Sequence, residues 1–145
     1  MKKIYKFTIF FYIVINIFNL SLSSEDFFKK GLKLYNDKKY QDARFMFERS
    51  IVFNPKDSNS YLYLAKIYNI EEDKKKEEKN LDATLLIEPN NEEAILMSMR
   101  VALEKSNYSR VKKLSETFKK VCNQLCKENK NILETLANIE PKDDS

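Results

Sequence analysis

Two prolines, Pro55 and Pro89, lie 34 residues apart, and each closes a stretch of regularly spaced apolar residues. A short polar segment follows each proline, and new apolar runs then begin at residues 61–65 and 94–97. Self-similarity at a fixed period is the signature of a repeat architecture, in which a unit buries its apolar face by stacking on its neighbours. This spacing constrains the fold more than any other feature of the chain, and it predicts a row of stacked units.

The repeated units are expected to be helical. Their apolar residues recur at three- and four-residue steps, which is the spacing along one face of an α-helix. The chain has one glycine and three prolines in 145 residues, and sheet folds need many more turn-forming residues than that. We therefore predict an all-α fold, with apolar faces that include Leu34, Phe47, Leu64, Leu81 and Val111.

The unit over residues 27–55 resembles the tetratricopeptide repeat. Gly31 stands where that family places a small residue, so that the two helices of a unit can approach each other. Ala43 is small at the crossing of the helices, and Tyr40 and Phe47 supply the aromatic residues around it.

The resemblance weakens towards the C-terminus. In the second unit Lys74 and Glu77 replace Tyr40 and Ala43, and in the third unit Asn123 replaces the closing proline. The resemblance implies a right-handed α–α superhelix of about three helical hairpins with a C-terminal capping helix. The expected domain covers residues 24–140, with repeats at about 24–57, 58–91 and 92–123, a capping helix at 124–140 and a frayed tail at 141–145.

Residues 1–23 have the pattern of an export signal. Lys2, Lys3 and Lys6 precede an apolar run of 16 residues over 7–22. A stable membrane span needs about 20 residues, so cleavage is favoured over retention as a membrane anchor. We expect an exported protein, periplasmic or associated with the cell envelope, that touches the membrane only if this segment is uncleaved.

Composition argues against nucleic-acid binding and against catalysis. Outside the N-terminal segment 23 basic residues oppose 22 acidic ones, and the two kinds are interspersed rather than gathered into a basic patch. The chain has no histidine, which excludes Ser-His-Asp and Cys-His arrangements and His-bearing zinc sites. A single glycine excludes a Gly-rich phosphate loop. We predict no catalytic residue, no cofactor and no metal site.

Cys122 and Cys126 are four residues apart, a spacing that places both on one face of a continuous helix. Two buried core residues are favoured, because free cysteine is commonly buried. A disulfide that pins the last helix is the alternative, since an exported protein meets an oxidising environment. The usual redox motif has two intervening residues, which disfavours thiol catalysis.

The resemblance also implies a binding surface. In the family, the first helix of each repeat lines a concave groove that holds an extended peptide or a partner helix. Apolar positions interleaved with Lys66 and Arg100 suit an amphipathic or acidic segment. Core packing is the competing interpretation, most of all for Leu62 and Leu96. The groove positions that the resemblance gives are Phe28, Leu32, Tyr35, Leu62, Lys66, Asn69, Leu96, Arg100 and Leu103.

Two functions of different classes remain open. The first is a non-catalytic adaptor of the bacterial cell envelope, whose groove binds a peptide or helix of another protein. The second is a structural subunit of a membrane-associated assembly or of a homo-oligomer. The Lys-, Asn- and Ile-rich composition is typical of AT-rich bacterial genomes.

Family members that bind the C-terminal carboxylate of heat-shock chaperones use a Lys, Asn and Arg clamp. The matching positions hold Phe28, Leu32, Tyr63, Glu93 and Met97, so that specificity is not implied.

Overall fold

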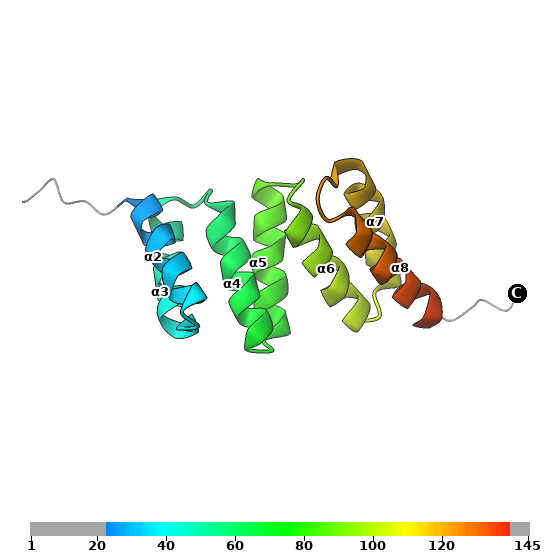
Figure 1. Cartoon of the computed structure of the whole chain (residues 1–145), viewed down its shortest axis with the longest axis horizontal. Helices are drawn as coiled ribbons and strands as arrows, with labels where there is room; N and C mark the ends of the chain where they lie inside the picture. Colours follow the sequence, from blue (N-terminus) through cyan, green and yellow to red (C-terminus); the bar gives the residue numbers. More distant parts are fainter. Residues whose placement is uncertain (1–22, 140–145) are drawn as a thin grey trace, which may run out of the picture.

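The computed structural model describes residues 23–139, which form three helical hairpins and a last single helix, with no strand among them. Consecutive helices pack against each other, so the hairpins stand side by side in one superhelical row (Figure 1). The all-α superhelical fold expected from the sequence is confirmed. The helices are α2 Ser24–Asn36, α3 Tyr40–Phe53, α4 Ser58–Ile70, α5 Lys74–Ile87, α6 Glu92–Glu104, α7 Tyr108–Val121 and α8 Cys126–Ile139.

The first helix of each hairpin begins at a polar cap residue, and these residues recur with the period of the repeat. Ser23, Asp57 and Asn91 precede α2, α4 and α6, and each accepts a hydrogen bond from a backbone N–H of the first turn. A side-chain acceptor at this position satisfies one of the N–H groups that the helix itself leaves free. The starts of the first helices are therefore fixed by local hydrogen bonds.

The turn inside each hairpin also repeats. Lys38, Glu72 and Ser106 lie 34 residues apart and adopt positive φ angles of 60°, 59° and 54°. A left-handed residue reverses the chain after the first helix, although it is disfavoured for residues other than glycine. The same backbone conformation thus closes all three hairpins, including the third, where the sequence resemblance is weakest.

The core is continuous between neighbouring hairpins. In the first hairpin Gly31 lies so close to α3 that a Cβ on it would be 2.7 Å from Cε1 of Phe47. The ring of Phe47 packs between Phe28 and Tyr63, with ring centroids 5.7 and 5.2 Å away.

Leu62 and Val101 belong to a second buried cluster that joins the middle hairpin to α6, and a third cluster joins α6, α7 and α8. That third cluster consists of Ile95, Leu96, Met99, Ala102, Val111, Phe118, Ile132 and Leu136.

The expectation that Cys122 and Cys126 share one helix is wrong. Helix α7 ends at Val121 and α8 begins at Cys126, so a chain reversal separates the two residues. The two cysteines are bonded to each other, with Cα atoms 5.3 Å apart. Neither is buried in the core: Cys122 is half-buried and Cys126 is exposed. The helical spacing failed here because the third unit breaks where the chain must turn back to form α8.

The predicted export signal lies outside the described residues except for Ser23, and the predicted tail lies wholly outside them. Within residues 23–139, none of the helices has the length and apolar character needed to span a membrane.

Candidate functional site

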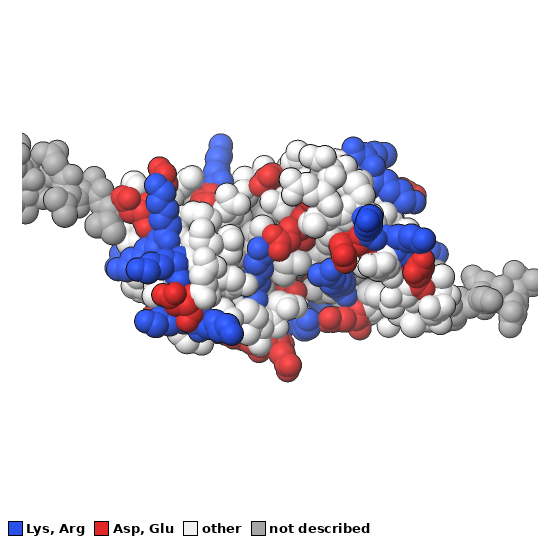
Figure 2. Space-filling view, in the orientation of Figure 1, with Lys and Arg blue, Asp and Glu red and all other residues white. Residues whose placement is uncertain are grey.

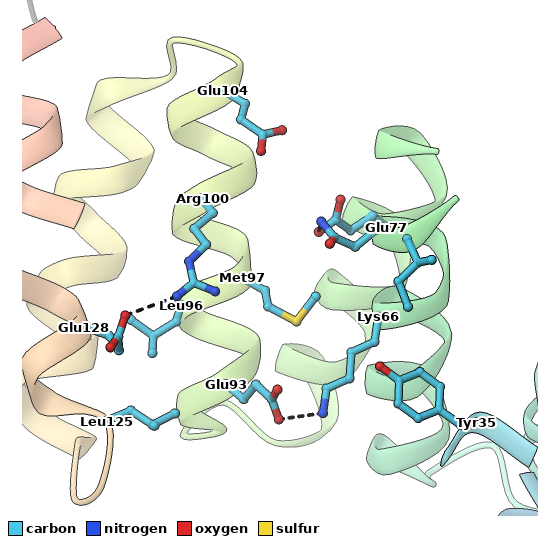
Figure 3. A pocket seen from close by; sticks show the side chains of 12 residues that line it. Tyr35, Lys66, Glu77, Glu93, Leu96, Met97, Arg100, Glu104, Leu125 and Glu128 are labelled. Carbon is cyan, nitrogen blue, oxygen red and sulfur yellow. Dashed lines mark hydrogen bonds and ion pairs between the residues drawn. The ribbon is translucent and has the colours of Figure 1, made fainter. Parts of the chain in front are cut away.

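A cleft of about 610 Å³ lies on the side of the row formed by the first helices of the hairpins (Figure 3). Its walls come from α4 and α6, its ends from α2 and α5, and its far rim from the start of α8. That volume is within the range of about 300–1,000 Å³ that ligand sites occupy. The lining residues are Tyr35, Lys66, Asn69, Ile70, Glu77, Glu93, Leu96, Met97, Arg100, Glu104, Leu125 and Glu128.

The structure brings together part of the groove that the sequence predicted. Five predicted positions line the cleft, namely Tyr35, Lys66, Asn69, Leu96 and Arg100.

Four predicted positions lie elsewhere. Leu62 lines an adjoining cleft of about 600 Å³ that shares Lys66 with the first one, and Phe28 lines a smaller hollow by the N-terminus of α2. Neither cleft is lined by Leu32 or Leu103.

Some of the predicted groove residues are mainly core residues. Leu96 and Leu62 are only 3% and 5% exposed. Phe28 packs against the buried ring of Phe47. These side chains make most of their contacts inside the protein and offer only an edge to a ligand. Met97 and Leu125 at the rim offer more accessible apolar surface.

Both predicted cations of the cleft are paired with carboxylates that the sequence reasoning did not assign to the groove. The Nζ of Lys66 lies 2.8 Å from Glu93, and Arg100 lies 3.4 Å from Glu128. Both pairs are visible in Figure 3. Lys66 also lies over the ring of Tyr63, 4.4 Å from its centroid, in a cation–π contact. Each cation of the cleft therefore already has an anionic partner.

A buried carboxylate closes one end of the cleft. Glu77 on α5 is 1% exposed, and its Oε1 accepts a hydrogen bond of 2.9 Å from the side-chain amide of Asn69. Its Oε2 lies 3.2 Å from Nζ of Lys74 but accepts no hydrogen bond among the described residues. The same ammonium group lies 2.9 Å from Glu104 on α6, and this contact is the main reason that the pKa of Lys74 is raised. Two carboxylates thus share one cation.

Glu77 is also where the sequence departs from the repeat pattern, because it takes the place of the small Ala43 of the first unit. That departure was the available signal for a functional carboxylate. The sequence alone shows this substitution only as a weakening of the repeat, because it does not show that α5 turns this position towards the cleft.

The rim formed by α8 is held by Glu92 at the start of α6. Its carboxylate accepts hydrogen bonds from the backbone N–H groups of Asn123, Gln124 and Leu125 at 2.8, 3.2 and 3.0 Å. These bonds, first of all the one from Leu125, lower the pKa of Glu92. The segment between the bonded cysteines is therefore tied to α6, which positions Leu125 at the cleft.

Aromatic packing forms the opposite end. Tyr35 lies edge-on to Tyr63 with ring centroids 5.1 Å apart, and burial raises the pKa of its hydroxyl group. Among residues 23–139, no three His, Cys, Asp or Glu side chains lie together in a way that could hold a metal ion. The cleft as described can provide apolar contact and charge pairing to a ligand.

No family model matches the sequence, and no curated protein sequence matches it. Solved structures do match the fold. The type III secretion chaperone SycD of Yersinia enterocolitica, in complex with a peptide of the translocator YopD, has a TM-score of 0.72 at 14% identity, with 81% of this chain and 94% of that chain covered. The chain has the tetratricopeptide-repeat fold.

Two further tetratricopeptide-repeat structures show the same likeness. The first such domain of Spaghetti (RPAP3), bound to the HSP90 peptide SRMEEVD, has a TM-score of 0.68 at 16% identity, covering 79% of this chain and 94% of that one. The domain of Sgt2 from Aspergillus fumigatus has a TM-score of 0.67 at 14% identity, covering 84% and 87%. In terms of the tetratricopeptide repeat, the cleft lies along α4 and α6, which are the first helices of the second and third units.

Proposed function

We propose that this protein is an interaction module that binds a peptide segment or a helix of another protein in the cleft between α4, α6 and α8. The carrying observation is the cleft itself, which has a volume of about 610 Å³ and is lined by both apolar and charged side chains. Two similar folds have peptides bound, one from an HSP90 and one from a translocator. A binding role, without catalysis, fits such a surface.

The proposal includes a location. The basic and apolar pattern of residues 1–23 supports export, and the bonded pair Cys122–Cys126 is stable in an oxidising compartment. We place the module in the bacterial cell envelope, where it acts as an adaptor for a partner protein. Fractionation of cells with an antibody against the chain, together with the mass of the mature protein, tests the location and the cleavage of the signal.

Site-specific photocrosslinking tests the binding site. A benzophenone amino acid in place of Met97 sits at the accessible rim of the cleft, and the same group in place of Glu116 sits on an exposed position of α7 outside it. We expect one defined protein to crosslink from position 97 and not from position 116. Equal capture from both positions, or capture from position 116 alone, contradicts the cleft as the binding site.

A structural-subunit role is the second candidate, and one observation favours it. Val52 and Leu86 occupy equivalent positions in the first two hairpins, and they are 74% and 84% exposed. Exposed apolar side chains at repeated positions suit a permanent contact. Sedimentation of the protein and of a Val52→Gln/Leu86→Gln variant distinguishes the two roles: a dimer that the variant disrupts supports the subunit, and a monomer in both cases supports the adaptor.

A further inference from the structure

We infer that the segment bound in the cleft is cationic, with lysine or arginine residues flanking apolar ones. This inference rests on the proposed function and specifies the chemistry of its partner. It keeps the amphipathic segment that the sequence favours, but it replaces the acidic segment that Lys66 and Arg100 also favour there.

The charge of the concave surface is opposite to that of the chain. The sequence as a whole has a formal net charge of +4. The two adjoining clefts have only two cations in their linings, Lys66 and Arg100, against six carboxylates. The carboxylates belong to Glu77, Glu88, Glu92, Glu93, Glu104 and Glu128.

The two cations are already neutralised. Lys66 is paired with Glu93 and Arg100 with Glu128. In the space-filling view, acidic and basic groups alternate over the region of α4, α6 and α8 rather than forming a basic patch (Figure 2). An acidic ligand at either cation lies beside the carboxylate that is already paired with it, so that like charges repel.

The remaining carboxylates lack an equal number of cations. Glu77 and Glu104 share the single ammonium group of Lys74. Figure 3 shows them on facing helices, α5 and α6, at one end of the cleft. Glu77 adds a carboxylate that is 1% exposed, with Oε2 accepting no hydrogen bond among the described residues, so little water screens its charge. A ligand cation beside the exposed Glu104, which shares Lys74 with Glu77, also interacts with this poorly solvated charge.

The adjoining cleft adds carboxylates held by neutral donors. Glu88 accepts hydrogen bonds from the Ser58 hydroxyl and the Asn91 amide, and Glu92 accepts three backbone N–H groups. Neutral donors fix these side chains in place without cancelling their charge. Glu88 and Glu92 therefore add two ordered negative charges to the cleft that shares Lys66 with the first one.

Apolar contacts set the other half of the recognition. Met97 and Leu125 lie at the accessible rim between the two acidic regions, and Ile70 is half exposed at the end near Glu77. An apolar residue of the ligand that packs on Met97 places its neighbours along the segment close to the carboxylates on either side. Lysine and arginine suit these places, because their aliphatic stems cover apolar surface while their charged groups reach outward.

Matched model peptides test the inference. The probe is a fluorescein-labelled amphipathic peptide of about 15 residues, long enough to form a helix when bound, with leucine on one face and lysine on the other. Its counterpart has glutamate in place of every lysine. Fluorescence anisotropy measures the dissociation constants of both peptides for the full-length protein at about 0.05 M and about 0.5 M NaCl, where the Debye length falls several-fold.

Two protein variants locate the effect. Glu93→Gln/Glu104→Gln removes two exposed carboxylates of the cleft, and Glu48→Gln/Glu116→Gln makes the same charge change at exposed positions of α3 and α7. Thermal unfolding followed by circular dichroism verifies that both fold. A benzophenone group in place of Met97 reports whether each peptide occupies the cleft, independently of its charge.

We expect the lysine peptide to bind at least about tenfold more tightly than the glutamate peptide at low salt, which corresponds to two or three favourable charge pairs. The preference should shrink at high salt and in the Glu93/Glu104 variant, but not in the Glu48/Glu116 variant. Equal binding of both peptides, with crosslinking from position 97, overturns the charge inference while the cleft remains a binding site. Tighter binding of the glutamate peptide also overturns it. If neither peptide crosslinks from position 97, the binding site and the charge inference both fail.

Discussion

The carboxylate of Glu92 accepts a hydrogen bond of 3.0 Å from the backbone N–H of Leu125, a residue 33 positions further along the chain. The bond joins the first turn of α6 to the segment that leads into α8, and the cleft has Leu125 at its rim. A helix start needs acceptors for its free N–H groups, and here the acceptor comes from another helix. The shape of the candidate site therefore depends on one carboxylate outside the repeat pattern.

Replacement of Glu92 by glutamine is expected to make stability less dependent on pH in the acid range. The pKa of Glu92 is lowered from 4.5 in the folded protein, mainly by the N–H of Leu125. The ionised form therefore stabilises the fold fully above the unfolded pKa, and this contribution is lost as the pH falls through the lower folded pKa. The free energies of unfolding of Glu92→Gln and wild type in urea should differ at neutral pH and converge at strongly acidic pH. A difference that stays constant with pH, or an equal effect of Glu116→Gln, contradicts this role.

Reduction of the Cys122–Cys126 bond is expected to have a modest and local effect. Only three residues lie between the two cysteines, and closing so short a loop stabilises a fold by about 2 kcal/mol at most. Hydrogen exchange with and without reductant should show faster exchange in α8 and unchanged exchange in α3 and α4. The Cys122→Ser/Cys126→Ser variant should be insensitive to reductant. Loss of protection throughout the chain would show that the bond supports the whole row rather than its end.

Addition of a methyl group at Gly31 is expected to destabilise the first hairpin. The Cβ would lie 2.7 Å from a carbon of the Phe47 ring, which is fully buried and cannot move freely. Overpacking costs about 1–3 kcal/mol, and the better helix propensity of alanine offsets about 1 kcal/mol of it. Chemical unfolding of Gly31→Ala should give a net loss of up to about 2 kcal/mol. In a Phe47→Leu background the same change should be neutral or stabilising, and an equal loss there excludes the proposed clash.

Replacement of Lys74 is expected to lower the free energy of unfolding more than replacement of its partner Glu77. Lys74→Met leaves the carboxylate of Glu77 buried with Asn69 as its remaining partner. We expect a cost of about 2 kcal/mol, below the about 3–5 kcal/mol seen when fully buried pairs are broken. Glu77→Gln keeps an acceptor for Asn69 and leaves Lys74 with Glu104, so its cost should be below about 1 kcal/mol. Equal costs of the two substitutions in urea unfolding would mean that Glu77 is well solvated.

The repeat was predictable because its determinants are local. Pro55 and Pro89, the small Gly31 and Ala43, and the periodic apolar residues act within a few residues of their own position. The recurring caps Ser23, Asp57 and Asn91 are a further local signal that the sequence contained. These caps predict the starts of the first helices, including the start of α2, which no proline precedes.

The cysteines show where local reasoning stops. Their spacing fits one helix face, but the chain between them turns back because α8 must cover the apolar faces of α6 and α7. That requirement comes from packing between helices, and no spacing within residues 122–126 expresses it.

The sequence by itself determined the class of fold, the period of the repeat and five of the residues that line the cleft, because helix periodicity, caps and turns are properties of neighbouring residues. Only the tertiary structure decided the charge of the cleft. Lys66 and Arg100 are cations in the sequence, but Glu93 and Glu128 cancel them in space. Glu77 becomes a buried carboxylate only when α5 packs beside α4 and α6. Charge pairing and burial depend on distances between residues far apart in the chain, and folding alone sets those distances.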